Sequence, residues 1–422
     1  MRHTRKIPQA IALLLSGALW AQAALAQLDH APLTEVEGLD FATMLDAALQ
    51  QAPQALETPV RAQQASDYAA AGGRFLAARP SLSYSIVDDR WRDNLGLRQQ
   101  DFSVNLPLWR LGERRDAQAL GAHYEEQVAQ WSTYLNWSLA GFLRTALNDL
   151  ESAEAQLALE RQAAANAEEL DRVTQRLFEA GSLAQLDTLQ TRNLLLAQQQ
   201  KVLDAEAFMV DSERTFQILT GLDRRPASLP PEERSPEEDP PDTHPLLRYM
   251  TSEVTLARDK VQQALQVNKG NPQLSIGTHS ERGDRLQNSN DSVMLSISVP
   301  IGGGNIVNSA TSNARRDQVN AEVALRQNRI ELQRLLHEAE HSLYTVEQQL
   351  PLAEEQATLA EQRYTMAQNA FALGELTATQ VVSAVQDLTT ARQMLTTLRL
   401  QRQRFISDYN HLIGDPWIEE LP

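Results

Sequence analysis

The chain contains no cysteine. Disulfide scaffolds, cysteine-type zinc sites and thiol nucleophiles all need a thiol, so the sequence excludes each of them. The fold must therefore be held together by packing alone.

Long apolar runs are also scarce. Residues 1–26 combine a basic start, a short apolar run over 11–20 and a small-x-small sequence at 24–26. This pattern is typical of a secretory signal peptide. A membrane anchor is the alternative, but the run is too short to span a bilayer well. No other stretch reaches 18 apolar residues, so we expect no transmembrane helix.

Basic residues are in the minority: 38 Lys and Arg stand against 55 Asp and Glu, for a net charge of −17. Binding to nucleic acid needs clustered basic residues, so we expect no nucleic-acid partner. Two interpretations of the acidic charge remain open. It keeps a large wetted surface soluble, or it lines a passage that favours cations.

The chain is internally duplicated. Short strings recur at an offset of 193 residues, which also relates the pairs Pro107 and Pro300, Gly181 and Gly374, and Gly221 and Gly414. Internal repeats decide architecture before any local pattern does. Each copy contains a helix–strand–strand–helix–helix unit, which is too long for an ordinary solenoid repeat.

Four segments alternate apolar residues with Ser, Asn and Gly, at about 80–88, 101–109, 272–280 and 292–301. This alternation is typical of a β-barrel with lipid outside and water inside. The alternative is a soluble hairpin with one face on a core. Strand-to-helix turns are expected at Pro107, Pro300, Gly302 and Gly303.

The remaining chain is predicted to be helical, with helices at 40–78, 113–180, 182–220, 246–269, 310–373 and 375–412. The two longest would each extend about 100 Å, beside two half-length helices in each repeat. Apolar residues at alternating spacings of three and four, from Leu186 to Val210 and again from Ala384, predict coiled-coil seams. Residues 222–245, rich in Pro and Glu, are expected to be an extended, exposed connector.

These patterns divide the chain into consecutive parts. They are a signal peptide (1–26), a first repeat (27–221), an acidic, proline-rich equatorial linker (222–245), a second repeat (246–415) and a tail (416–422). Four strands cannot close a barrel, and open edges are not tolerated in lipid. We therefore expect a homo-oligomer, with eight strands from two copies or twelve from three.

Two motifs suggest chemistry that the context does not support. His337 and His341 match the zinc-protease string H-E-x-x-H, but they lie within a continuous helix. A third ligand is required, and Glu361 would sit about 30 Å along the same rod. The triple glycine at 302–304 lacks the residues of a phosphate loop. We predict no enzyme activity, no cofactor and no metal.

The chain resembles the TolC-like outer membrane factor family over residues 40–415. The resemblance rests on the duplication, the two hairpins and the motif Phe178-x-x-Gly181-x5-Asp187-x-Leu189, matched in part by Phe371, Gly374 and Val382. It implies a mainly α fold with a membrane β-barrel portion. A homotrimer would form a 12-stranded barrel, continued by a long periplasmic α-helical coiled-coil barrel.

The resemblance also implies a function, that of a passive outer membrane exit duct that docks to a periplasmic adaptor and an inner membrane pump in a tripartite efflux system. Outer membrane lipid would surround the barrel of a Gram-negative bacterium. An outer membrane component of type I protein secretion is an alternative within the fold. An exported coiled-coil structural or adhesin protein is an alternative of another class. The exported substrate stays open.

The resemblance assigns site residues at the helical tip. A pore aperture would involve Asp187, Gln380 and Ser383, and an adaptor would contact Phe178, Gly181, Leu183, Phe371, Gly374 and Leu376. The second copy lacks an acidic residue at the position of Asp187, which implies a weaker cation filter. The alternative for Asp187 is a solvated carboxylate on a helix surface.

Overall fold

The computed structural model describes residues 31–228, 231–301 and 304–415. The expected signal peptide, Gly302, Gly303 and the tail at 416–422 lie outside the described residues. Within the described part, none of the helices is long and apolar enough to cross a membrane.

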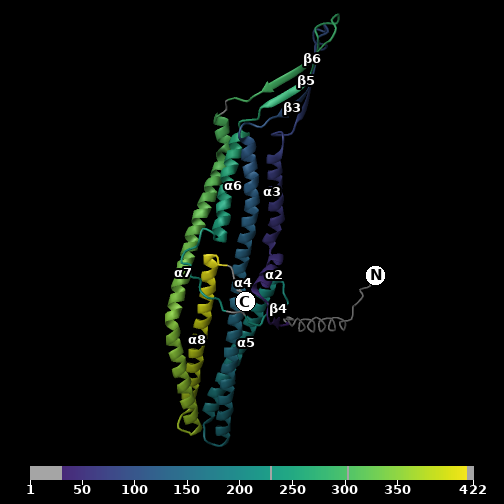
Figure 1. The fold of residues 1–422 in the computed structure, drawn as a ribbon. Coiled ribbons are helices and arrows are strands. Elements are labelled where there is room, and N and C mark those ends of the chain that lie inside the picture. Colours follow the sequence, from purple (N-terminus) through teal and green to yellow (C-terminus); the bar gives the residue numbers. More distant parts are fainter. Residues whose placement is uncertain (1–30, 229–230, 302–303, 416–422) are drawn as a thin grey trace, which may run out of the picture. The chain divides into compact units, whose positions relative to one another are not determined.

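The chain is mainly helical, and its element order repeats (Figure 1). The first copy comprises α2 (Phe41–Gln51), η1 (Pro53–Leu56), α3 (Glu57–Gly73), β2 (Ser81–Asp88), β3 (Arg98–Pro107), α4 (Glu113–Glu179) and α5 (Gln185–Thr220). The second comprises α6 (Pro245–Val267), β5 (Gln273–Arg282), β6 (Asn290–Ser298), α7 (Gly304–Ala372) and α8 (Ala378–Ile413). Two short strands, β1 (Thr34–Val36) and β4 (Arg224–Pro226), pair in parallel.

Two expected helix limits are wrong. A single helix over 40–78 is replaced by α2, η1 and α3, because Pro53 lacks the N–H that a continuing helix needs and instead starts the 3-10 turn. Helix α7 begins at Gly304 rather than at 310, since Val307 and Thr311 are already buried on one face of its first turns.

The four long strands form one antiparallel sheet in the order β2-β3-β5-β6. The central pair β3–β5 joins the two repeats, and β2 and β6 are its open edges. Gly277 of β5 lies opposite Ser103, so close that a Cβ there would collide with the carbonyl oxygen of Phe102. A glycine is therefore needed where the repeats meet.

The two faces of this sheet differ in chemistry. One face carries exposed apolar side chains, including Leu82 and Tyr84 on β2 and Val293 and Leu295 on β6. The other is polar: the Asn105 amide nitrogen donates to the Ser83 hydroxyl at 2.6 Å, and the Ser275 hydroxyl donates to the Asn105 amide oxygen at 2.6 Å. Within the described residues, no core covers the apolar face, unlike that of a soluble hairpin.

The chain divides into two compact units. One contains the described residues of Met1–Asp40, Asp149–Pro230 and Gln356–Thr396, and the other contains Phe41–Asn148, Pro231–Glu355 and the described residues of Thr397–Pro422. In the second unit, Ala65 of α3, Leu120 and Tyr124 of α4 and Leu256 of α6 form a buried cluster. The sheet belongs to this unit.

The two predicted seams behave differently. On α8, Ala384, Leu388 and Leu398 are buried within the chain. On α5 the corresponding residues are exposed, with Leu186 at 65% and Leu203 at 66%. Helix α5 packs in its own chain through a different face, which includes Thr191, Leu194, Leu195 and Gln198. The apolar stripe of α5 is therefore left uncovered by the residues that the structure describes.

More than half of the described residues of the linker are exposed, but a few positions are anchored by distant partners. Arg225 is buried and pairs with Glu35, Glu154 and Glu213. In the other unit, the partly buried Glu232 pairs with Arg144 at 3.0 Å and accepts hydrogen bonds from Ser407 and Asn410. Composition indicated exposure because it does not reveal which charged groups have partners far away in the sequence.

Candidate functional site at the helical tip

Two nearly identical turns join the long helices. Gly181 ends α4 and Gly374 ends α7, and both have φ of 78°. Gly181 N donates to Phe178 O at 2.8 Å, and Gly374 N donates to Phe371 O at 3.0 Å. Glycine reaches this left-handed conformation without a Cβ penalty, which is why it ends helices so often. The two copies therefore have the same backbone conformation at these turns.

Asp187 and Gln380 perform the same task in the two copies. The Asp187 carboxylate accepts a hydrogen bond from the backbone N–H of Ala184 at 3.2 Å, at the start of α5. The Gln380 side-chain oxygen accepts from the N–H of Thr377 at 2.9 Å, at the start of α8. In both copies the side chain at the third helical position reaches back to the N-cap N–H, which is one half of the capping-box pattern.

This capping role was missed by the sequence analysis, although the signal was present. A carboxylate or amide three residues after the N-cap is the capping-box pattern. The change from Asp to Gln removes a charge but keeps the hydrogen-bond acceptor.

A hydrophobic core holds the tip together. Leu194 and Leu195 of α5, Phe371 of α7 and Val381 of α8 are among its buried members. Leu183 and Leu376, from the two turns, pack against it and are partly buried, whereas Phe178 is 36% exposed. Of the six residues expected to contact an adaptor, Phe371 is buried in this core beside the turn that carries Gly374 and Leu376.

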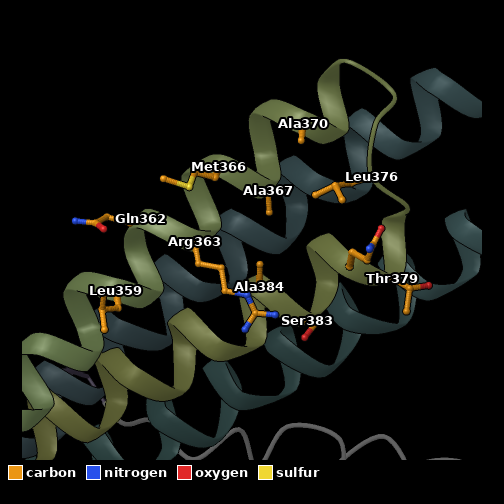
Figure 2. A pocket seen from close by; sticks show the side chains of 11 residues that line it. Leu359, Gln362, Arg363, Met366, Ala367, Ala370, Leu376, Thr379, Ser383 and Ala384 are labelled. Atoms are coloured by element: carbon orange, nitrogen blue, oxygen red, sulfur yellow. The ribbon is translucent and has the colours of Figure 1, made fainter.

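A groove of about 690 Å³ lies between α7 and α8 beside this turn (Figure 2). Gln380 and Ser383 line it, together with apolar side chains such as Met366 and Leu376. Arg363 reaches across from α7 and pairs with Asp387 of α8. Asp187 does not line the groove, so the structure brings together two of the three expected aperture residues.

Polar contacts tie the tip helices to each other above this core. Thr379 of α8 donates to Gln190 of α5 at 2.8 Å, and Gln393 of α8 donates to Glu160 of α4 at 2.6 Å. Arg192 lies 3.5 Å from Asp171, which also accepts a hydrogen bond from Thr191. Because most of these groups are partly solvated, each pair contributes little to stability on its own.

The H-E-x-x-H string forms no metal centre. His337 and His341 are exposed on α7 with ring centroids 6.5 Å apart. Glu338 is paired with Arg334 and Glu340 with Arg234. Among the described residues, no group of three or more His, Asp or Glu side chains is arranged to hold a metal ion.

Comparison with solved structures shows which fold this is. The channel CusC matches with a TM-score of 0.71 at 14% identity, over 92% of this chain and 97% of that one. The outer membrane protein VceC of Vibrio cholerae matches with a TM-score of 0.69 at 14% identity, over 88% and 95%. The outer membrane channel CmeC of Campylobacter jejuni matches with a TM-score of 0.68 at 15% identity, over 89% and 85%.

The sequence comparisons are more local. No curated protein matches the chain. Residues 242–406, which make up most of the second repeat, match the family model of the outer membrane efflux protein. Residues 242–406 are thus similar in sequence to this family, and the chain as a whole shares its fold with the outer membrane channels named above.

Proposed function

We propose that the protein is the passive outer membrane exit duct of a tripartite efflux system and works as a homotrimer. One observation carries the proposal: the chain leaves two kinds of surface without a partner. The sheet has two open edges and an exposed apolar face, and α5 has an exposed apolar stripe. Both would be covered by copies of the chain and by lipid.

Strand number allows two or three copies, and the resemblance to the TolC-like family favours three. Each chain supplies four long strands, so three copies give a 12-stranded barrel with an even strand count, as in bacterial barrels. Closure would pair β2 of one copy with β6 of the next. Every backbone N–H and C=O in the membrane would then have a partner, which lipid requires. The polar row of Ser83, Asn105 and Ser275 would face the water-filled lumen.

The helical tip would be the regulated end of the duct. In this proposal Gly181, Gly374, Leu183, Leu376 and Phe178 lie at the periplasmic mouth and meet the adaptor, with Phe371 packed behind them. Gln380 and Ser383 line the groove beside this turn. Asp187 would contribute a single acidic ring to the aperture. The inner membrane pump would supply energy and select the substrate.

An adhesin or a purely structural coiled coil does not account for the sheet. Such a protein has no need for four amphipathic strands whose apolar face is exposed. Secretion of proteins by a type I system uses the same closed duct, so the identity of the pump would decide between it and efflux.

Paired cysteines on the two sheet edges test the duct. The native chain has no cysteine, so an introduced pair reports alone. Ser83→Cys on β2 would be combined with single cysteines along β6, starting with Ser296→Cys. We expect oxidised membranes to contain crosslinked dimers and trimers. Ser83→Cys combined with Ser85→Cys, both on β2, is the control and should not crosslink copies through the β2–β6 seam.

One result would contradict the proposal. A monomer that carbonate releases from the membrane fraction, with no crosslinking along the whole of β6, would exclude the duct.

A further inference from the structure

The two hairpin loops are joined into one cap. The loop between β2 and β3 contacts the loop between β5 and β6 through three hydrogen bonds. Arg285 N donates to Leu95 O at 3.3 Å, the Arg285 guanidinium donates to Asn94 O at 3.0 Å, and Arg282 Nε donates to Gly96 O at 3.3 Å. The two arginines are thereby held in place by backbone carbonyls.

Backbone conformation makes this contact possible. Asn94 has φ of 48° and Gly96 has φ of 107°, and a Cβ at Gly96 would lie 2.6 Å from the backbone nitrogen of Arg285. Only glycine allows this approach. The cap is therefore a built structure, and any side chain at position 96 would push the two loops apart.

The acidic side chains of the cap are largely used inside its turns. The Asp89 carboxylate accepts from the N–H groups of Leu95 and Gly96 at 2.7 and 3.0 Å. The Asp284 carboxylate accepts from Leu286 and Gln287 at 2.7 and 3.1 Å. These carboxylates are directed at backbone donors and not at the neighbouring guanidinium groups.

Most arginines of the cap form no salt bridge. Five arginines occupy the two loops and the adjoining strand ends, namely Arg90, Arg92, Arg98, Arg282 and Arg285. Arg90 pairs with Asp88 at 2.7 Å, and among the described residues none of the other four forms a salt bridge. Acidic residues are equally numerous in these segments, so the cap is distinguished by its four guanidinium groups without a salt bridge and not by a net positive charge.

Apolar side chains alternate with these arginines. Trp91 is 97% exposed, Leu286 97% and Leu95 69%. They lie just beyond the exposed apolar face of the strands. A tryptophan and aliphatic side chains next to free guanidinium groups are typical of the boundary between lipid tails and charged headgroups.

We propose that this arginine cap binds the phosphate groups of anionic glycolipid headgroups in the outer leaflet. The inference rests on the proposed function, which puts the hairpin loops at the outer surface. Guanidinium groups match phosphate oxygens in a bidentate geometry, and they are more weakly hydrated than ammonium groups. Trp91 and Leu286 enter the adjoining acyl region, which favours a lipid phosphate over free phosphate.

The experiment uses the full-length trimer in detergent, analysed by native mass spectrometry with added lipid A. The variant Arg92→Gln/Arg98→Gln removes two guanidinium groups that hold no part of the cap. Each arginine near an anionic surface is worth about fivefold in binding, so this variant should retain roughly 25-fold less lipid A. The matched control is Arg326→Gln/Arg329→Gln, on α7, which should retain as much as the wild type.

Three comparisons decide the source of the ligand. The wild type should lose its retention when lipid A is replaced by its dephosphorylated form, and inorganic phosphate at the same concentration should not displace the lipid. Equal retention by the wild type and the Arg92/Arg98 variant, or of both lipid forms, would overturn the inference. So would displacement by inorganic phosphate.

Conductance in planar bilayers is measured on the same preparations, and it tests the proposed duct function independently of the lipid site. Channels that conduct but show no preference for the phosphorylated lipid would exclude the lipid site alone. An absence of conductance would exclude the duct, and the inference with it.

Discussion

At the scale of single residues, the most constrained group is a partly buried histidine beside a tryptophan. The rings of His411 and Trp137 stack with centroids 4.4 Å apart at an angle of 7°, and Trp137 Nε1 donates to His411 O at 2.9 Å. Gly141 lies against the ring, and a Cβ there would be 2.5 Å from His411 Nε2. The Nδ1 atom of this partly buried ring is itself buried and has no hydrogen-bond partner, which disfavours a charged imidazole.

Burial lowers the pKa of His411 to about 3, with Arg144 and His244 adding to the effect, and burial likewise lowers the pKa of His244 to about 4. The unfolded chain binds protons at its ordinary value, about 6.5. Below that pH the unfolded state therefore holds more protons than the folded one. Stability is complete above about pH 6.5 and falls as the pH drops toward 4 and then 3.

We predict that His411→Gln flattens this acid dependence. Each buried histidine lowers the free energy of unfolding by about 1.4 kcal/mol per pH unit below its unfolded pKa. Thermal midpoints at pH 7, 6 and 5 should thus decline less steeply in the variant than in the wild type. The exposed His337→Gln is the control, and an unchanged slope for His411→Gln would contradict the assignment.

A second prediction distinguishes two roles of Asp187, namely its negative charge and the hydrogen bond that it accepts at the start of α5. Asp187→Ala removes the acceptor for Ala184 N–H and should weaken the first turn of α5 by about 1 kcal/mol. Asp187→Asn keeps the acceptor, as Gln380 does naturally. Amide exchange at residues 184–188 should therefore rise in the alanine variant only.

The same pair of variants tests the aperture. If Asp187 forms an acidic ring, both variants should lose part of the cation preference measured in planar bilayers. A cation preference that survives in both would leave Asp187 with a capping role alone.

At the scale of elements, the start of the linker is anchored by ion pairs to β1 and α5. Arg225 on β4 pairs with Glu213 of α5 at 3.1 Å and with Glu35 of β1 at 2.8 Å, and the side chains of Arg225 and Glu213 are both 8% exposed. Removing one partner of a buried pair leaves the other charge uncompensated. The short β1–β4 pairing depends on this group.

Arg225→Ala should therefore destabilise the unit that contains β1 and β4 by about 3–5 kcal/mol. Limited proteolysis should then cut within residues 222–228 more readily in the variant than in the wild type. The neighbouring Arg224→Ala, at an exposed position, is the matched control. Equal cleavage of the Arg225 variant and the wild type would show that the ion pairs of Arg225 contribute little to the stability of this unit.

At the scale of the whole molecule, the exposed stripe of α5 predicts how assembly fails. Leu196 and Leu203 are 51% and 66% exposed, whereas Leu194 is buried in the tip core. Leu196→Ser/Leu203→Ser should lower the trimer fraction and leave the fold of each chain intact. Leu194→Ala should instead destabilise the tip by about 2–5 kcal/mol.

Chemical crosslinking measures the trimer fraction, and circular dichroism of the same samples reports the fold. Loss of helicity in the Leu196/Leu203 variant would mean that the stripe packs within the chain.

The parts that sequence could predict are those set by local pattern. Period-two alternation located the four long strands within about three residues, and Gly181 and Gly374 marked the turns. The ion pairs of Arg225 and Glu232 could not be predicted, because their partners are distant in sequence. Periodicity identified the apolar stripes of both α5 and α8. It could not show that the stripe of α8 is buried within the chain while the stripe of α5 is exposed.

The open edges of the sheet have a consequence for quality control in the cell. A solitary chain entering the bilayer would expose the backbone groups along β2 and β6 to hydrocarbon, and each unsatisfied group there costs several kcal/mol. In the proposed trimer, insertion and assembly would therefore be a single event, because only a closed ring pairs the backbone groups of both edge strands.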